Sequence, residues 1–370
     1  MATASTTGGG TQARAILRRV WRGVNVPLIA VLLGTLIGAV LLLLSGVNPL
    51  DAYGALIEGA IGSPQTIQRT LEKATPLIFS GLAVAFAFKA GLFNIGAQGQ
   101  LIIGAIVTAY VGIAIDGLPA IIHAPLALLA GGLAGALYGF IPGALKAYTG
   151  AHEVIVTIML NYVAYNITNY LVNGPWKDPS PTNVIARTAR ILPSAELPIL
   201  GNVPLGFIVA LIAAVVVWWV LYRTTLGYAI RTVGLNASAA QYAGIRVAQM
   251  IILSMMISGL LAGFGGSVET LGITRRYEPG FNIGLGFDGI TVALLGKTSP
   301  FGVIPAALLL GAMRAGSNVM QLEAGVAKEI IDIITAFILF FVAADVIVKW
   351  IIRQRESDDD KVVLSKGWGG

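Results

Sequence analysis

Asn161, Tyr165 and Asn169 recur at every fourth position within a long apolar stretch, with Tyr162 and Asn166 beside them. Residues four apart lie on one face of an α-helix. Polar side chains at membrane depth are costly and usually face a bundle interior or a wet cavity. Amides and phenols both donate and accept hydrogen bonds, and tyrosine adds a ring for stacking. The face suits a neutral polar solute with a flat ring or a sugar; hydrogen bonding between helices is the alternative interpretation.

The tetrapeptide Phe-Asn-Ile-Gly occurs twice, at residues 93–96 and 281–284, and each copy interrupts an apolar stretch. A broken helix leaves backbone groups without partners, which lipid cannot satisfy, so such breaks persist only against protein or a wet cavity. Paired interruptions in two halves of a membrane protein indicate a permeation pathway, although a chance repeat is the alternative. We therefore expect the pathway to include Asn94, Gln98, Asn161, Tyr162, Tyr165, Asn166, Asn169, Asn282 and Asp288.

Few charges fall within apolar stretches: Glu269, Asp288, Arg314, Asp332 and Asp345. Arg314 and Asp332 lie on neighbouring predicted spans, and we expect them to pair. A proton-driven carrier would bury a titratable relay near the midplane. No such chain of residues is evident, which weakens the interpretation as an ion-driven carrier.

Cofactor chemistry is disfavoured by the composition. The chain has no cysteine and only two histidines, which argues against thiolate, haem and histidine metal sites. Gly296-Lys297-Thr298 resembles the end of a phosphate-binding loop, but Thr291 stands where the first glycine should be. We expect no catalytic residue, metal or cofactor on this chain.

The elements that position these residues must be membrane helices. Hydrophobic residues make up 56% of the chain and charged residues only 11%, against about 25% in a soluble domain. A spanning helix needs roughly 20 apolar residues. We predict an all-α polytopic membrane protein of about ten spans. They are 26–44, 74–91, 99–115, 124–146, 153–172, 204–221, 251–269, 284–296, 301–318 and 330–349, the eighth being a short or broken helix.

Most of the 24 Lys and Arg residues fall on the side of the two termini in this topology, which predicts that both termini are cytoplasmic. The net charge of +6 therefore reflects cytoplasmic flanks and not nucleic-acid binding. The first span is too long for a signal peptide, so we read it as an uncleaved helix. An odd number of spans separates the Phe-Asn-Ile-Gly copies. They should face opposite sides, which predicts an inverted repeat of spans 2–5 and 7–10.

The predicted organisation is a cytoplasmic tail (1–25), a transmembrane domain (26–350) and a second cytoplasmic tail (351–370). An outer loop at 173–203, together with 51–73, is expected to receive an extracellular partner, although a solvated loop is an equal alternative. In the cytoplasmic loop 222–250, Asn236 can cap a short helix at 237–242, which Gly244 would end.

That short helix would present small alanine side chains, which let another surface approach closely. It is either an ordinary amphipathic connector or a coupling helix that docks on a separate cytoplasmic subunit. The residues expected to couple are Arg231, Gly234, Asn236, Ala239, Ala240, Tyr242 and Gly244.

Glycine recurs at every fourth place in the predicted span 124–146, and Gly259 and Gly263 repeat the spacing in 251–269. Glycines four apart let helix backbones approach closely. We predict a packing seam. Its members in the span 124–146 are Gly131, Gly135, Gly139 and Gly143.

The stretches Gly91–Gln100, His152–Tyr162, Arg231–Ile245 and Ala293–Gly302 occur in the same order as in a known family. Over residues 26–350 the chain resembles the permease subunits of bacterial ABC importers of the branched-chain amino acid/ribose/nucleoside type. It is most similar to the nucleoside (simple-sugar-like) permeases. It departs from the family pattern at His152, where asparagine is expected, and at Gln98, where glutamate is usual.

The resemblance implies an alternating-access pathway for a nucleoside or a related sugar-like solute, in a bacterial inner membrane. It implies ABC ATPase subunits that bind ATP and Mg, with no enzyme activity on this chain. The loop Arg231–Ile245 would contact them. It also implies a second permease, identical or different, and an extracytoplasmic substrate-binding lipoprotein or periplasmic protein. A stand-alone ion-coupled transporter and a membrane anchor without transport are the alternatives.

Overall fold

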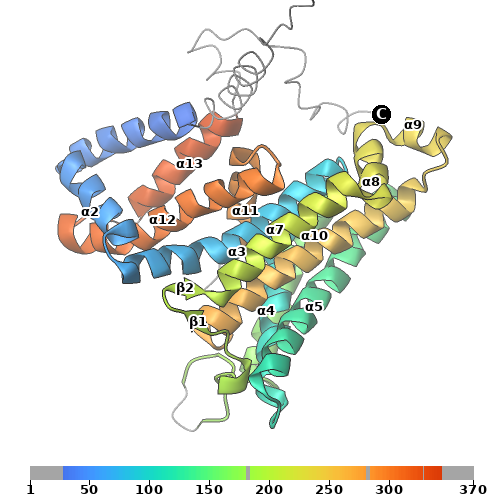
Figure 1. Ribbon diagram of the computed structural model, residues 1–370, viewed down its shortest axis with the longest axis horizontal. Helices are drawn as coiled ribbons and strands as arrows, with labels where there is room; N and C mark the ends of the chain where they lie inside the picture. Colours follow the sequence, from blue (N-terminus) through green and yellow to red (C-terminus); the bar gives the residue numbers. More distant parts are fainter. Residues whose placement is uncertain (1–27, 181–183, 281–283, 328, 344–370) are drawn as a thin grey trace, which may run out of the picture. The chain divides into compact units, whose positions relative to one another are not determined.

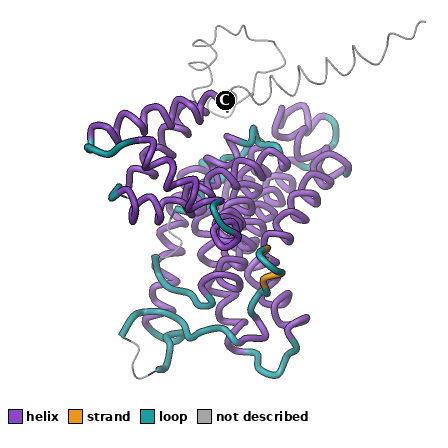
Figure 2. Tube along the Cα trace, turned by 60° about the vertical axis from the view of Figure 1, so that its left-hand side comes forward, coloured by secondary structure: helices purple, strands orange, loops and turns teal. Residues whose placement is uncertain are grey.

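The computed structural model describes residues 28–180, 184–280, 284–327 and 329–343. The chain divides into two compact units, one formed by 1–53 with 321–362 and the other by 54–320 with 363–370. Most of the described chain is helical (Figure 2). The described strands, β1 (Ile199–Leu200) and β2 (Val203–Pro204), form one short antiparallel pair. The prediction of an all-α polytopic membrane protein is confirmed.

Within the described residues, seven helices are long and apolar enough to cross a membrane, and each overlaps a predicted span. They are α3 (Pro64–Lys89), α4 (Ala97–Ala114), α5 (Ala120–Thr149), α6 (Glu153–Asn173), α7 (Leu205–Arg223), α10 (Val247–Glu269, continued by the π-helical turn η2, Thr270–Thr274) and α12 (Pro300–Ala324).

The remaining predicted spans correspond to shorter described helices. The first is the helix Leu28–Leu44, and the last is α13 (Glu329–Ala343), beyond which residues 344–349 lie outside the described part. The eighth is α11 (Leu285–Leu295), whose 11 residues are far fewer than the roughly 20 needed to cross. The expected half-helix after the second Phe-Asn-Ile-Gly is therefore present.

Two segments that the sequence analysis treated as loops contain helices in the structure. Residues 51–73 form most of α2 (Pro49–Ile61) and the start of α3, because Ser63 caps α3 and Pro64 occupies its first turn. In the cytoplasmic loop, α8 (Thr225–Leu235) precedes the expected short helix. Thr224 Oγ1 accepts from Gly227 N at 3.1 Å, which starts α8 directly after α7.

The second unit is built around α10, whose most extensive contact is with α5 and which also packs on α3 and α4 (Figure 1). A Cβ atom added at Gly135 would overlap the Gly259 carbonyl oxygen, and one added at Gly139 would overlap the Met255 carbonyl. The two backbones are therefore in direct contact along a glycine stripe. This confirms the predicted packing seam.

The two ends of this helical bundle carry different connectors (Figure 1). At one end lie α8 and α9 (Ala237–Tyr242). At the other lie β1 and β2, with the 3₁₀ turn η1 (Pro193–Ala195) preceding them in the chain. In the first unit, Gly34 on the helix Leu28–Leu44 lies against Ile338 of α13.

Candidate functional site

The first Phe-Asn-Ile-Gly segment links α3 to α4, and its asparagine is fully buried. Asn94 Nδ2 donates to Gln100 Oε1 and to Ser258 Oγ of α10, each at 2.8 Å. Ser258 Oγ in turn donates to the Ala83 carbonyl of α3 at 2.6 Å. These hydrogen bonds join the segment at the first break to α4 and α10, and through Ser258 to α3. Asn94 therefore stabilises the break itself.

Asn161 of α6 holds the other side of the same break. Its Oδ1 accepts from Gly99 N at 2.8 Å, and its Nδ2 donates to the Ile95 carbonyl at 3.1 Å. Asn161 is only 3% exposed. At this position the alternative given by the sequence, hydrogen bonding between helices, is the one that the structure shows.

Gln98 connects the first break to the second. Its Oε1 accepts a hydrogen bond of 2.7 Å from Gly286 N, in the first turn of α11. A Cβ atom at Gly286 would overlap the backbone of Gln98, so the starts of α4 and α11 are in contact. Asn282 of the second Phe-Asn-Ile-Gly lies outside the described residues.

The two segments reach this meeting point from opposite ends of the bundle. Lys89 Nζ, at the end of α3, donates to Thr298 Oγ1, just after α11, at 2.9 Å. The segment before the second break is joined to the other end, where Ile191 N donates to the Arg275 carbonyl at 2.9 Å. This arrangement supports the predicted opposite orientation of the two copies, and the inverted repeat as a whole stays a prediction.

The rest of the polar face of α6 becomes progressively more exposed. Tyr165 is half-buried. Tyr162, Asn166 and Asn169 are exposed, with 63% of Tyr162 accessible. Polar groups on a spanning helix require a partner other than lipid. This exposed stripe therefore needs protein or water beside it.

The charges inside the second unit are arranged differently from the prediction. Arg314 Nη2 of α12 pairs with Asp288 Oδ2 of α11, where the sequence suggested Asp332. The half-helix α11 explains this pairing, because it places Asp288 in its first turn beside α12. Glu269, at the end of α10, is 4% exposed, and its Oε2 has no hydrogen-bond partner among the described residues.

The predicted short helix is present with the predicted bounds. Asn236 Oδ1 accepts from Ala239 N at 2.9 Å and caps α9, and Gly244 adopts a φ of 80° just after it. Tyr242 is 93% exposed. Ala240 is fully buried, so it is not presented outward as the sequence suggested. The other residues of α9 are exposed: Ala237, Ser238, Ala239, Gln241 and Tyr242.

The neighbouring helix α8 lies against the first break. A Cβ atom at Gly234 would come within 2.8 Å of the Gly91 backbone nitrogen. The Arg231 guanidinium lies 5.0 Å from the centre of the Tyr222 ring, a cation–π contact that fixes α8 on the end of α7. Helix α8 therefore lies between α9, which follows it in the chain, and the backbone at the end of α3.

The outer loop 173–203 is joined to the segment before the second break. Thr188 N donates to the Tyr277 carbonyl at 3.0 Å, and Arg275 Nε lies 3.0 Å from Glu196 Oε2. Burial raises the pKa of Tyr277 to about 12, so its phenol stays neutral. The loop is therefore joined directly to the segment that precedes the second break.

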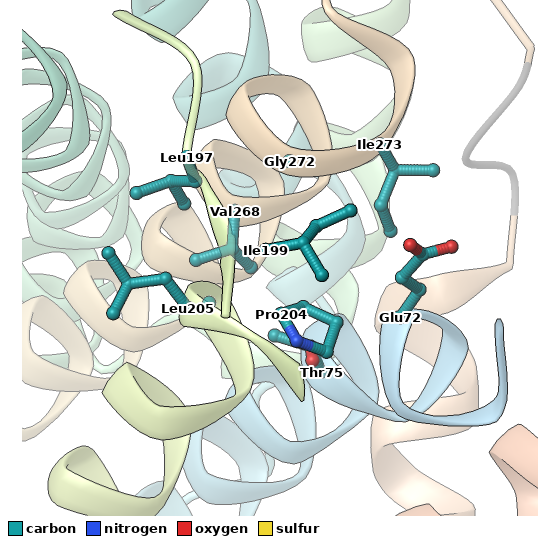
Figure 3. Close-up of a pocket in the computed structure, with 10 residues that line it drawn as sticks. Glu72, Thr75, Leu197, Ile199, Pro204, Leu205, Val268, Gly272 and Ile273 are labelled. Carbon is teal, nitrogen blue, oxygen red and sulfur yellow. The ribbon is translucent and has the colours of Figure 1, made fainter. Parts of the chain in front are cut away.

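A small pocket lies beside this loop, between α3 and η2, and is largely apolar (Figure 3). Glu72 supplies its carboxylate, and none of the predicted pathway residues lines it. Its lining residues are Glu72, Thr75, Leu197, Ile199, Pro204, Leu205, Gly206, Val268, Gly272 and Ile273. We do not assign the solute to this pocket.

Sequence reasoning omitted Gln100 and Ser258 from the site, although both are buried and bonded to Asn94. Gln100 offered a signal, because it stands two residues after Gln98 in the first turn of the predicted helix. Ser258 offered only its position beside Gly259 of the packing seam.

Residues 66–343 match the family described as branched-chain amino acid transport system / permease component. The chain is 46% identical over 339 residues to the guanosine ABC transporter permease NupP of Bacillus subtilis, covering 89% of this chain and 95% of NupP. It is 38% identical to the nucleoside ABC transporter permease NupB of Lactococcus lactis (91% and 95%). It is 33% identical to the glucose ABC transporter permease TsgB13 of Haloferax volcanii (87% and 87%). No solved structure matched the chain.

Proposed function

Because this chain belongs to the family of branched-chain amino acid transport system permease components, we propose that it forms the membrane pathway of an ATP-driven importer for nucleosides. NupP, named for guanosine, and NupB, named for nucleosides, are more similar to it than TsgB13, which is named for glucose. Both solutes carry sugar hydroxyls, and the nucleoside adds a flat ring. A related sugar-like solute is therefore the alternative substrate in this proposal.

The observation that carries the proposal is the exposed polar stripe of α6. Within the described part of the chain, Tyr162, Asn166 and Asn169 are exposed on a spanning helix. A second permease, either a copy of this chain or a related one, placed against α6 would enclose the stripe and leave a polar route between the two subunits. The amides and the phenol would then offer donors and acceptors to a solute that carries both.

ATP hydrolysis belongs on a separate ABC ATPase, with ATP and Mg bound there. The exposed face of α9, with Tyr242 at its end, is the surface proposed to dock on this subunit. Gly234 of α8 then transmits the displacement to the backbone of the first break at Gly91. This chain itself would contribute the hinge, at α8 and the first break, and the pathway.

On the other end, loop 173–203 is the surface proposed to receive an extracytoplasmic substrate-binding protein. Its hydrogen bonds to Arg275 and Tyr277 connect docking with the second break. This assignment places α8, α9 and both termini in the cytoplasm of a multi-pass cell-membrane protein, in agreement with the distribution of basic residues.

A stand-alone ion-coupled carrier is the competing function, and Glu269 is the observation that favours it. A buried acid without a hydrogen-bond partner on one oxygen is a feature of ion-coupled carriers. Against this, the neighbouring intramembrane acid Asp288 is paired with Arg314. An ion-coupled carrier would take up solute when this chain is alone in the membrane.

Proteoliposomes test the two functions. The chain is reconstituted alone, and then with its ATPase, second permease and binding protein, under defined H⁺ and Na⁺ gradients. We expect uptake of radiolabelled guanosine only by the complete assembly with ATP inside. Its rate should not change with the H⁺ or the Na⁺ gradient. Uptake by the chain alone that follows an ion gradient would overturn the proposal.

A further inference from the structure

Two exposed asparagines of α6 have amide groups that are held in one orientation. Asn166 Nδ2 donates to the Tyr162 carbonyl, and Asn173 Nδ2 donates to the Asn169 carbonyl, each at 2.8 Å. We propose that the amide oxygens of Asn166 and Asn173 accept hydrogen bonds from donor groups of the passing nucleoside. Both residues would thus determine specificity. This inference deepens the proposed function and rests on it, because it requires that the nucleoside passes along α6.

The orientation of each amide follows from what its partner can do. A carbonyl oxygen only accepts, so the end of the amide that lies 2.8 Å from it must be the NH₂ group. The amide oxygen is the other branch of the same planar group. Within the described part of the chain, the side chains of Asn166 and Asn173 make no further hydrogen bond. Each oxygen is therefore left as an acceptor at an exposed position.

Both oxygens belong to one line of exposed polar residues. At about 3.6 residues per turn, positions 162, 166, 169 and 173 fall within roughly 60° of one another around α6. All four residues are exposed. A rise of about 1.5 Å per residue places Asn173 roughly 10 Å beyond Asn166 along the helix axis. A solute that moves along this line therefore meets the two acceptors in succession.

Asn161 shows a different use of an amide on the same helix. It is buried, its Oδ1 accepts from Gly99 N, and its Nδ2 donates to the Ile95 carbonyl. This structural asparagine uses both ends of its amide on another segment of the chain. Asn166 and Asn173 use only the nitrogen, and they use it on their own helix. An acceptor left on a spanning helix requires a donor from outside that helix.

A nucleoside supplies donors of this kind. Guanosine carries the ribose hydroxyls, the ring N1–H and an exocyclic amine, and each of them loses water when the solute enters a narrow route. A donor that loses water without gaining an acceptor is unfavourable. Amide oxygens along the route replace that water. The line of polar residues therefore favours solutes that bring donors.

Serine substitutions separate the projecting acceptor from the hydrogen bond within the helix. A serine hydroxyl can donate to the carbonyl four residues earlier, as the Thr168 hydroxyl does to Ala164 at 2.9 Å on this helix. Asn166→Ser and Asn173→Ser keep that bond, but their oxygen stays beside the backbone and no longer projects. Asn318→Ser, at an exposed asparagine of α12, is the matched control.

The experiment measures the maximal rate of uptake by the complete assembly, with the binding protein saturated by the solute under test. Guanosine is compared with analogues that each lack one donor: inosine, 1-methylguanosine and the 2′-, 3′- and 5′-deoxyguanosines. In the wild type we expect at least one analogue to be about three- to tenfold slower than guanosine, the factor of one hydrogen bond. In the double variant Asn166→Ser/Asn173→Ser, guanosine should slow to the rate of that analogue. Asn318→Ser should keep the wild-type ratio.

The ratio compares two solutes on one preparation, so a difference in the amount of folded protein cancels. A double variant that leaves the ratio unchanged for every analogue would overturn the inference. Loss of association between the double variant and the second permease would also overturn it, because the two oxygens would then face protein. A wild-type assembly that takes up no nucleoside would instead contradict the proposed function.

Discussion

The amide nitrogen of Gly286 lies 2.7 Å from Gln98 Oε1, which joins the first turn of α11 to the first turn of α4. The two residues are 188 positions apart, yet each follows a copy of the same tetrapeptide. The first turns of the two helices that follow the tetrapeptides thus meet in the interior, where the side chain of one accepts a backbone hydrogen bond from the other. An account of transport must explain how this junction is kept while the helices around it move.

The tightness of this junction predicts that Gly286→Ala destabilises the protein. The added Cβ would overlap the backbone of Gln98, and overpacking of this kind costs about 1–3 kcal/mol. Thermal unfolding in detergent, followed by circular dichroism, measures the loss. Gly54→Ala is the control, because nothing lies within 4 Å of its Cβ position and alanine favours helix there. Equal melting of the two variants would show that the contact is not close.

Asn161 and Asn169 should respond differently to substitution by leucine, although they lie on the same helical face. Asn161→Leu leaves Gly99 N and the Ile95 carbonyl without partners, at about 1–3 kcal/mol for each buried group. This variant should fail to assemble. Asn169→Leu leaves the fold intact and lowers uptake, because only the exposed stripe has changed. Size-exclusion profiles and uptake assays separate the two effects; a folded, inactive Asn161→Leu would disprove the structural assignment.

The ion pair between Asp288 and Arg314 should appear as a positive coupling in a double-mutant cycle. Their side chains are 23% and 31% exposed, so water weakens the pair, and we expect a coupling of about 1 kcal/mol. The variants are Asp288→Asn, Arg314→Gln and both together, compared by chemical or thermal unfolding. Exactly additive losses would mean that the two side chains do not interact in the membrane.

The cap of α9 predicts a defect in coupling without a defect in folding of the spans. Asn236→Ala removes the acceptor for Ala239 N, which costs about 1 kcal/mol of local helix stability. Co-purification with the ATPase should weaken and uptake should fall, while Asn236→Asp, which keeps the acceptor, should restore both. Normal association of Asn236→Ala with the ATPase would argue that α9 is an ordinary connector.

The sequence predicted the elements that depend on local composition. The spans follow from apolar length, and the seam of Gly135 and Gly259 follows from glycine spacing. The cap at Asn236 is a local signal of the same kind. Helices α2 and α8 were missed because they are short and mixed in polarity, so their pattern does not differ from that of a polar loop.

The partners of the polar residues could not be predicted in the same way. Asn161 and Asn169 look equivalent in the sequence, and only the packing of α4 against α6 distinguishes the buried one from the exposed one. Arg314 was expected to pair with Asp332 because their spans are consecutive. The half-helix α11 instead brings Asp288 to it. Contacts across a broken helix depend on where the break lies in space, which spacing alone does not give.

The central claim is that this chain is a passive pathway driven by a separate ATPase. It is tested most directly by uptake into proteoliposomes of the complete assembly carrying a hydrolysis-dead ATPase, compared with the active one at equal ATP and equal protein. We predict that sustained accumulation of guanosine against its gradient is lost with the inactive ATPase. Accumulation at the rate of the active assembly would contradict the claim.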